Sequence, residues 1–236
     1  MHIPDGFINA GTSVGAGIAA AGGISVCLRR TADALEERLA PLAGLVAAFV
    51  FAVQMLNFPV VSGTSGHLLG GALAAVLVGP WAGAVCVAVV LMIQALLFAD
   101  GGLTALGLNV VNMAFVTAFG GYGAFLLLRR VLPRTRTGIA AASGVAATVG
   151  VVLASVAFVI EYAIGGTGDA SVGTVAGAMV GLHVLIGIGE GFLTAITVSA
   201  VLAVRPDLVH GAAGLVPVLD LRERVAAPRG SLSERR

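Results

Sequence analysis

Seven long apolar runs, separated by charged residues, prolines and glycine clusters, constrain what this chain can fold into. A helix needs about 20 mostly apolar residues to cross the hydrocarbon core of a bilayer. Of the 236 residues, 58% are hydrophobic and only 11% are charged, whereas about 25% are charged in an average soluble domain. We therefore expect an all-α integral membrane protein with seven transmembrane helices. The predicted spans are residues 10–28, 41–57, 67–79, 80–98, 104–128, 139–164 and 173–204.

The arginines predict the orientation of these spans. All 13 basic residues are arginines, and if the N-terminus is outside, each lies in an inner loop or in the C-terminal tail. The outer loops then contain Asp5, Asp100 and Asp169 and no basic residue, which is the asymmetry typical of a multi-pass protein of a bacterial-type cell membrane. The expected organisation is an extracytoplasmic N-terminus (1–9) within a membrane domain (1–204), followed by a polar cytosolic tail (205–236).

The first apolar run has an alternative interpretation as a secretory signal peptide. The stretch from Ser13 to Leu28 has the length of the apolar part of such a peptide. A signal peptide carries its positive charge before the apolar run, but here Arg29 and Arg30 follow it. We therefore expect this helix to remain attached.

Composition excludes several classes of function. Lysine is absent, which removes a P-loop lysine and a Schiff-base lysine, so another chain must power any ATP-driven work. The net charge of +1 argues against a nucleic-acid partner. Cys27 and Cys86 lie in apolar runs and support neither a disulfide framework nor a cysteine metal site.

The first two residues can chelate a metal ion. Histidine is too bulky for the usual removal of the initiator methionine, so Met1 keeps a free amine. That amine, the deprotonated backbone nitrogen of His2 and Nδ1 of its ring close one five-membered and one six-membered ring on one cation. Planar amide geometry keeps these nitrogens nearly coplanar, which favours Ni(II), Cu(II) and Co(II) over Mg, Ca or tetrahedral Zn. A histidine after Met1 can also be without function, and the interpretation needs a fourth nitrogen.

His67 is the candidate for that fourth nitrogen. It lies in the glycine-rich stretch Ser62–Gly71, at the outer end of the third predicted span and on the same side as His2. Glycines let a buried loop turn and approach its neighbours closely, and non-helical backbone occurs at membrane depth only where protein buries it or water lines it. The alternative for His67 is a helix-start histidine bonded to a neighbouring hydroxyl.

Several amide and carboxyl side chains lie near the outer ends of the predicted helices, at the level of His67. Polar groups at membrane depth are costly and tend to face an interior site, so they could hold the N-terminal segment or orient a ligand imidazole. The alternative is hydrogen bonding between helices, worth about 0.6 kcal/mol per pair. These candidates are Asn57, Gln94, Asn109, Asn112 and Glu161, with Thr64 and Ser65 as supports of the His67 loop.

His183 and Glu190 lie on one face of the last span. Their spacing of seven residues separates them by about 10 Å along a helix axis, too far for a direct bond. We interpret them as packing residues or as a coupling element.

Four stretches resemble the substrate-binding S component of nickel/cobalt transporters of the energy-coupling factor class. They are Met1–Gly6, Gly66–Gly71, Gly101–Gly107 with Asn109 and Asn112, and Ile186–Gly191. The resemblance implies the six-helix core of S components plus one extra N-terminal helix. It also implies metal binding by nitrogens of Met1, His2 and His67.

The same resemblance implies a function. The subunit would capture Co(II) or Ni(II) as transported substrate, with a slight preference for cobalt, for cobalamin biosynthesis or for nickel enzymes. A transmembrane coupling subunit, two cytosolic ATPases and a small two-span accessory subunit would be its partners. One alternative is a proton-coupled carrier that uses Glu161 or Glu190. The other is a metalloenzyme with His67, His183 and Glu190 around one ion, which the lack of an HExxH motif disfavours.

Overall fold

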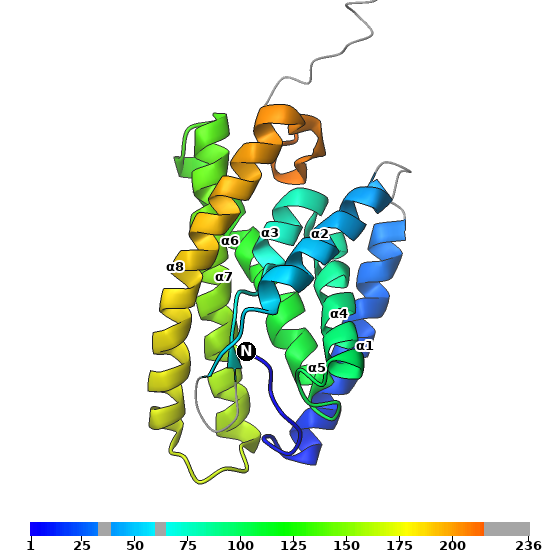
Figure 1. The fold of residues 1–236 in the computed structure, drawn as a ribbon, viewed down its shortest axis with the longest axis vertical. Helices are drawn as coiled ribbons and strands as arrows, with labels where there is room; N and C mark the ends of the chain where they lie inside the picture. Colours follow the sequence, from blue (N-terminus) through cyan, green and yellow to red (C-terminus); the bar gives the residue numbers. More distant parts are fainter. Residues whose placement is uncertain (33–38, 60–64, 215–236) are drawn as a thin grey trace, which may run out of the picture.

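The structure, a computed structural model, describes residues 1–32, 39–59 and 65–214 and is a bundle of helices (Figure 1). Within this described part, five helices are long and apolar enough to cross a membrane. They are α1 (Ala10–Ala32), α4 (Pro80–Leu97), the continuous helix Leu106–Val131, α7 (Arg136–Gly165) and α8 (Val172–Val204). Two shorter helices are α2 (Leu39–Gln54) and α3 (Gly71–Val78). Each predicted span contains one of these helices, and the multi-pass helical fold is confirmed.

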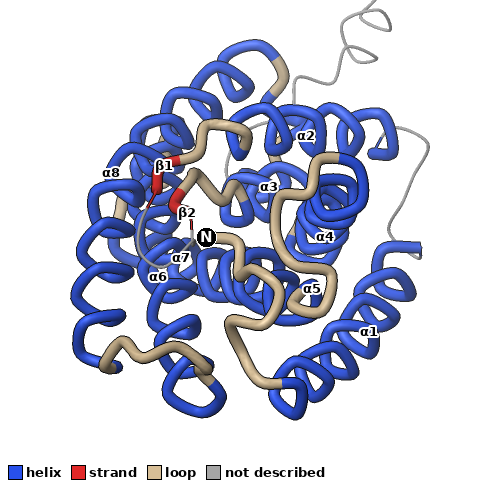
Figure 2. The backbone as a smooth tube through the Cα atoms, turned by 60° about the horizontal axis from the view of Figure 1, so that its bottom comes forward, coloured by secondary structure: helices blue, strands red, loops and turns tan. Residues whose placement is uncertain are grey.

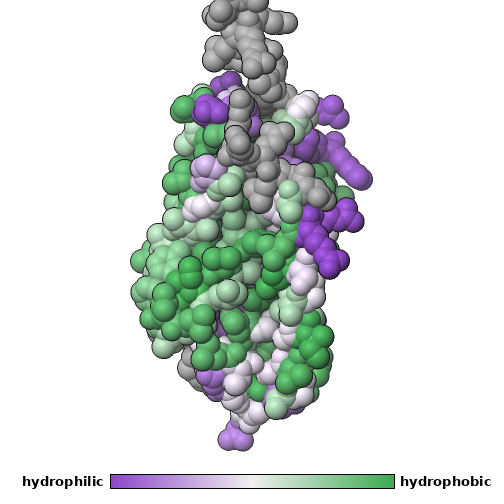
Figure 3. Space-filling view, turned by 90° about the vertical axis from the view of Figure 1, so that its right-hand side faces the viewer, coloured by the Kyte–Doolittle hydropathy of each residue, from purple (hydrophilic) through white to green (hydrophobic). Residues whose placement is uncertain are grey.

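Large hydrophobic side chains cover the outside of the bundle. Leu97, Leu185 and Phe192 are 75%, 66% and 72% exposed, and Figure 3 shows hydrophobic residues over most of one face, with hydrophilic ones gathered towards the upper part. Apolar patches of this extent are rare on soluble monomers. They are expected where lipid tails replace water as the solvent.

The helix Leu106–Val131 changes its winding along its length. It begins as α5 (Leu106–Asn109), continues as the π-helix η1 (Val110–Gly120) and ends as α6 (Gly121–Val131). The π-helix is a rare conformation that often occurs near functional sites. Asn109 and Asn112 lie on either side of the first change of winding.

Small residues bring α7 and α8 into close contact. A Cβ atom on Gly144 would lie 2.7 Å from the carbonyl oxygen of Gly191, and a Cβ on Gly191 would lie 2.7 Å from that of Gly144. Next to this crossing, the Thr148 hydroxyl donates a hydrogen bond to the Gly187 carbonyl at 2.8 Å. Close backbone approach and interhelical hydrogen bonds are what hold helices together in lipid.

The predicted start of the third span, residue 67, is wrong. Residues 67–70 are not helical, and α3 begins only at Gly71, after Gly70 adopts a left-handed φ of 75°. The N–H groups of Leu69 and Gly70 donate to the Glu190 carboxylate instead of starting a helix. All eight residues of α3 are buried, so α3 is the centre of the bundle. Before it, strand β1 (Phe58–Pro59) pairs antiparallel with β2 (Ser65–Gly66).

The chain continues to pack against the bundle after α8. Two short 3-10 helices, η2 (Pro206–Leu208) and η3 (His210–Ala212), follow Val204. Val209 and Ala212 are 2% and 3% exposed, so this first part of the expected polar tail is partly buried. Residues 215–236 of that tail lie outside the described residues.

Candidate metal centre

The first residues of the chain fold back into one end of the bundle. Met1 and Ile3 are completely buried, and His2 is 4% exposed. The Ile3 N–H donates to Asn109 Oδ1 at 2.8 Å, and the Ile3 carbonyl accepts from Asn109 Nδ2 at 3.3 Å and from the Gly102 N–H at 2.9 Å. Figure 2 shows the N-terminus at the centre of this end, beside β2. Bonds to Ile3 therefore fix the position of the Met1 amine and the His2 side chain.

Two polar side chains hold the loop that carries His67. Gln54 Nε2, at the end of α2, donates to the Leu69 carbonyl at 2.7 Å. The Glu190 carboxylate, from α8, accepts from the N–H groups of Leu69 and Gly70. Charge-assisted bonds of this kind are among the stronger hydrogen bonds in proteins. Held in this way, His67 is completely buried.

The structure brings His2 and His67 into direct contact. His2 Nδ1 lies 3.1 Å from His67 Nε2, and the two rings stack with their centroids 4.6 Å apart. The other nitrogen of each ring faces a carbonyl oxygen, which can only accept: His67 Nδ1 faces Leu68 O at 2.7 Å, and His2 Nε2 faces Gln94 Oε1 at 3.2 Å.

The bond to Leu68 determines where the ring proton of His67 lies. A ring nitrogen that donates to a carbonyl carries the hydrogen, which leaves the second nitrogen of a neutral imidazole with a free lone pair. His67 Nε2 is therefore left with a free lone pair, and it faces His2 Nδ1. His2 Nδ1 lies within hydrogen-bond distance of both this nitrogen and the Asp100 carboxylate, and both can accept. The lone pair of His67 Nε2 thus faces His2 Nδ1 at 3.1 Å, where a proton or a metal ion can lie between the two nitrogens.

Burial favours the neutral, metal-binding forms of the ionisable groups of this pair and of the Met1 amine. Burial lowers the pKa of the Met1 amine well below its usual value, against the attraction of Asp100. Burial, then the nearby amine and His2, lower the pKa of His67 well below the normal range. Burial also lowers the pKa of His2, although its bond to Asp100 opposes the shift. Metals bind to deprotonated nitrogen ligands.

Asp100 is a site residue that the sequence interpretation missed. Its Oδ1 lies 3.0 Å from His2 Nδ1, and its Oδ2 accepts from Asn57 Nδ2 at 3.1 Å. Ala99, before it, is the only non-glycine with positive φ in the described part, at 52°, and such strain collects at functional sites. Gly101, after it, has φ 93° and leaves room for His2, because a Cβ there would lie 2.9 Å from His2 Cδ2. In the sequence, the feature that could have identified Asp100 is its position between an apolar run and two glycines.

An opening leads from this centre to the outside of the bundle. A cavity of about 270 Å³ is lined by His2, Asp5, Ser65, Asp100 and neighbouring backbone. Asp5 accepts from both the N–H and the hydroxyl of Thr104, which fixes the N-terminal segment at the rim.

Only some of the other predicted site residues lie near His2. Gln94, Asn109 and, through Asp100, Asn57 belong to the network around His2. Asn112 Nδ2 donates to Glu161 at 2.6 Å, and no bond links this pair to Met1, His2 or His67 among the described residues. Thr64 lies outside the described residues.

His183 is buried and only partly bonded. Its Nδ1 donates to the Met179 carbonyl at 2.7 Å, while its Nε2 has no partner in the described ranges. Across residues 1–32, 39–59 and 65–214, no three His, Cys, Asp or Glu side chains are grouped to hold a metal ion. His67, His183 and Glu190 thus do not form the common metal site that the enzyme alternative requires.

Comparison with known proteins gives consistent matches over the membrane domain. A family model described as the cobalt uptake substrate-specific transmembrane region matches residues 2–208. A putative fused nickel transport protein of Archaeoglobus fulgidus is 42% identical over 213 residues, which is 89% of this chain and 68% of that protein. A cobalt transport protein of Pelobacter propionicus is 35% identical and covers 86% of this chain and 91% of its own length.

A solved structure has the same fold. The crystal structure of a transition metal transporter superposes with a TM-score of 0.80 at 31% identity, over 86% of this chain and 93% of that one. The fold and the sequence comparisons therefore point to the same class of protein.

Proposed function

Because the chain belongs to the family of cobalt uptake substrate-specific transmembrane regions, a transmembrane component of cobalt and nickel transport, we propose that it captures Co(II) or Ni(II) through four nitrogens. The ligands are the Met1 amine, the His2 backbone nitrogen, His2 Nδ1 and His67 Nε2. One observation carries the proposal: His2 Nδ1 and His67 Nε2 converge at 3.1 Å while carbonyl oxygens occupy the other nitrogen of each ring.

The distance between these nitrogens suits a planar site. Two ligands at right angles, each about 2.0 Å from the metal, lie about 2.8 Å apart. His2 Nδ1 and His67 Nε2 lie 3.1 Å apart, so they need to move only slightly closer to bind one metal ion. The other two nitrogens belong to the first two residues, so chelate rings set their spacing. Planar four-nitrogen ligation favours Ni(II) and Co(II).

Asp100 balances the charge of the loaded site. A divalent ion bound by one deprotonated amide nitrogen and three neutral nitrogens has a net charge of +1. An isolated charge is expensive to bury, and the Asp100 carboxylate, 3.0 Å from His2 Nδ1, brings the total to zero. We propose that Asp100 stabilises the bound ion without being one of the planar ligands.

The proposed topology has seven membrane crossings, with α2 and α3 as the short ones, residues 1–9 outside and the C-terminus in the cytoplasm. The distribution of arginine supports this orientation, because with the N-terminus outside none of the 13 arginines of the sequence would fall on the outer side. The ion would then enter from outside through the cavity beside Asp100.

Import against a gradient needs an energy source that this chain does not supply. The chain has no lysine for a P-loop, and its relative in Archaeoglobus fulgidus is named as a fused protein, of which this chain covers 68%. We propose that the subunit works with a transmembrane coupling subunit, two cytosolic ATPases and a small accessory subunit, in the cell membrane. It has no catalytic role of its own.

The N-terminal amine offers the sharpest test. Metal content is measured by elemental analysis of protein purified in detergent with a C-terminal tag, for the native start and for a variant with one extra residue before Met1. Intact mass establishes each N-terminus, and the same residue added after Arg236 is the matched control. We expect the native protein and the control to retain one Co or Ni per chain and the N-terminal variant to lose it.

Full retention by the N-terminally extended variant would contradict the proposal, because side chains alone would then hold the ion. The carrier alternative, which uses Glu161 or Glu190, makes a different prediction. Metal uptake by cells that lack the partner ATPases would favour it over the proposed ATP-driven import.

A further inference from the structure

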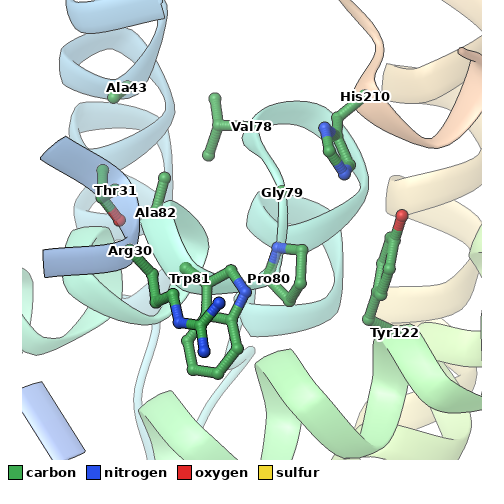
Figure 4. A pocket seen from close by; sticks show the side chains of 10 residues that line it. All are labelled: Arg30, Thr31, Ala43, Val78, Gly79, Pro80, Trp81, Ala82, Tyr122 and His210. Atoms are coloured by element: carbon green, nitrogen blue, oxygen red, sulfur yellow. The ribbon is translucent and has the colours of Figure 1, made fainter. Parts of the chain in front are cut away.

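A second cavity, of about 240 Å³, lies where α1 ends and α4 begins (Figure 4). These helix ends are far from the N-terminus in the bundle (Figure 1). Its polar lining consists of Arg30, Thr31, Tyr122 and His210. None of its described lining residues is acidic. In the described part of the chain, the cavity therefore presents hydrogen-bond donors and positive charge, and its lining includes no carboxylate.

The start of α4 contributes backbone donors to this cavity. The helix begins at Pro80 after Gly79, whose φ of 90° turns the chain sharply between α3 and α4. The first N–H groups of a helix have no partner within the helix, and Trp81 and Ala82, which follow Pro80, line the cavity. The N-terminal end of an 18-residue helix also has a partial positive charge that favours anions.

Thr31 provides a second, independent indication of a ligand. Its side chain is only 7% exposed, and its hydroxyl oxygen has no hydrogen-bond partner in the described part of the chain. Figure 4 shows this oxygen on the side of Arg30. A buried hydroxyl without a partner is costly, and a hydroxyl can donate to an anion that enters the cavity.

Arg30 places a positive charge at the cavity, and Arg129 lies near His210 on the other side. The Arg30 guanidinium stacks over Trp81, with Cζ 5.7 Å from the ring centroid, and Trp81 is 38% exposed. On the far side, burial and the charge of nearby Arg129 lower the pKa of His210. Tryptophan and arginine together are typical of the boundary between lipid tails and headgroups.

We propose that this cavity binds the phosphate group of an anionic phospholipid. Arg30, the Thr31 hydroxyl and the first N–H groups of α4 would hold the phosphate, while Val78, Pro80 and Trp81 pack against the apolar part of the lipid. A free phosphate ion has the same charge chemistry, but the apolar walls favour a lipid. Basic pockets between helices on the cytoplasmic side commonly hold such headgroups. The proposal does not depend on the metal site.

Native mass spectrometry can test this proposal. Protein is reconstituted in nanodiscs of mixed phosphatidylglycerol and phosphatidylcholine, and the lipids that remain bound after release are counted. The variants are Arg30→Gln and Thr31→Val, and Arg29→Gln is the matched control because it removes the same charge one residue away, outside the cavity lining. We expect one retained phosphatidylglycerol, reduced at least about fivefold by Arg30→Gln, the effect of one basic residue near a membrane surface.

Thr31→Val should reduce retention although it leaves every charge in place, and Arg29→Gln should not. Equal losses in Arg29→Gln and Arg30→Gln would overturn the proposal, because the attraction would then be non-specific. A parallel arm adds inorganic phosphate to protein in phosphatidylcholine alone. Stabilisation by phosphate that depends on Arg30, without retained phosphatidylglycerol, would overturn the lipid assignment. Thermal unfolding in detergent verifies that each variant is folded.

Discussion

The two ends of the bundle differ in the charge and the exposure of their polar groups. At the N-terminal end, neutral nitrogens from His2 and His67 are buried and bonded into a network that contains one carboxylate, Asp100. At the arginine end, Arg30 lies exposed on Trp81 and lines a cavity without a described acidic residue. The first arrangement suits a cation that must lose its water, and the second suits an anion that keeps part of its hydration.

This contrast follows from what each ligand requires. A transition metal is bound by lone pairs at fixed distances, so the protein must fix the ring protons and exclude water. A phosphate is bound by hydrogen-bond donors, and a charged donor such as a guanidinium strengthens these bonds without exclusion of all water. The metal end accordingly contains the strained Ala99 and the buried Glu190.

Of the substitutions proposed here, removal of the His67 side chain should have the largest effect on metal affinity. We expect His67→Ala to weaken Co(II) and Ni(II) binding by more than about 100-fold, because even the loss of a residue that only supports a ligand costs about 10- to 100-fold. His210→Ala, a histidine at the other end of the bundle, is the control and should leave metal affinity unchanged. Isothermal titration of the metal-free proteins measures both. Equal losses would mean that the two ends are not separate sites.

Replacement of Asp100 should have the next largest effect. Asp100→Asn keeps the size of the side chain and removes the charge that balances the ion, so metal affinity should fall about 10- to 100-fold. Asp5→Asn is the matched control, because Asp5 lines the same cavity but bonds to Thr104. A larger loss in Asp5→Asn would show that the rim, rather than the carboxylate at His2, controls binding.

Glu190→Gln tests how the His67 loop is held. The amide can accept only with its single oxygen, so one of the N–H groups of Leu69 and Gly70 loses its partner. We expect the free energy of unfolding to fall by about 1 to 3 kcal/mol, the cost of one unsatisfied buried group, and metal affinity to fall less than in Asp100→Asn. Thermal unfolding in detergent measures the first effect. Glu161→Gln changes a carboxylate that bonds Asn112 instead of the loop, and an equal loss of metal binding there would contradict this role for Glu190.

The sequence predicted the helices better than it predicted the loops between them. Apolar length and arginine placement are local properties, and each predicted span does contain a helix. The predicted start of α3 was wrong because Glu190, 121 residues further along the chain, accepts a hydrogen bond from the Leu69 N–H. A contact at that separation depends on how α8 packs, which hydropathy does not show.

The candidate site was predictable only in part for the same reason. Met1, His2 and His67 were selected by their ligand chemistry, and the structure brings them together, although their role as metal ligands stays a prediction. Asp100 was assigned to an outer loop because its contact with His2 depends on the strained turn at Ala99. Asn112 was grouped with Asn109 by spacing, but it bonds Glu161 across to α7.

The smallest expected effect is the contribution of His67 to the pH dependence of stability. Burial lowers the pKa of His67 in the folded protein, whereas its ordinary value is 6.5. As the pH falls through 6.5, the unfolded chain takes up a proton that the folded metal-free protein does not, so stability is highest above this value and falls below it.

A single group of this kind contributes at most about 1.4 kcal/mol per pH unit. The unfolding free energy of the metal-free protein should therefore fall between pH 7.5 and 5.5, and the contribution of His67 is the part of this fall that His67→Ala removes. His67→Ala lowers stability at every pH, but its slope over this interval should be flatter. Chemical unfolding at several pH values measures the slope, and parallel lines for the two proteins would show that His67 titrates alike in the folded and unfolded chains, which would contradict its burial as a neutral ligand.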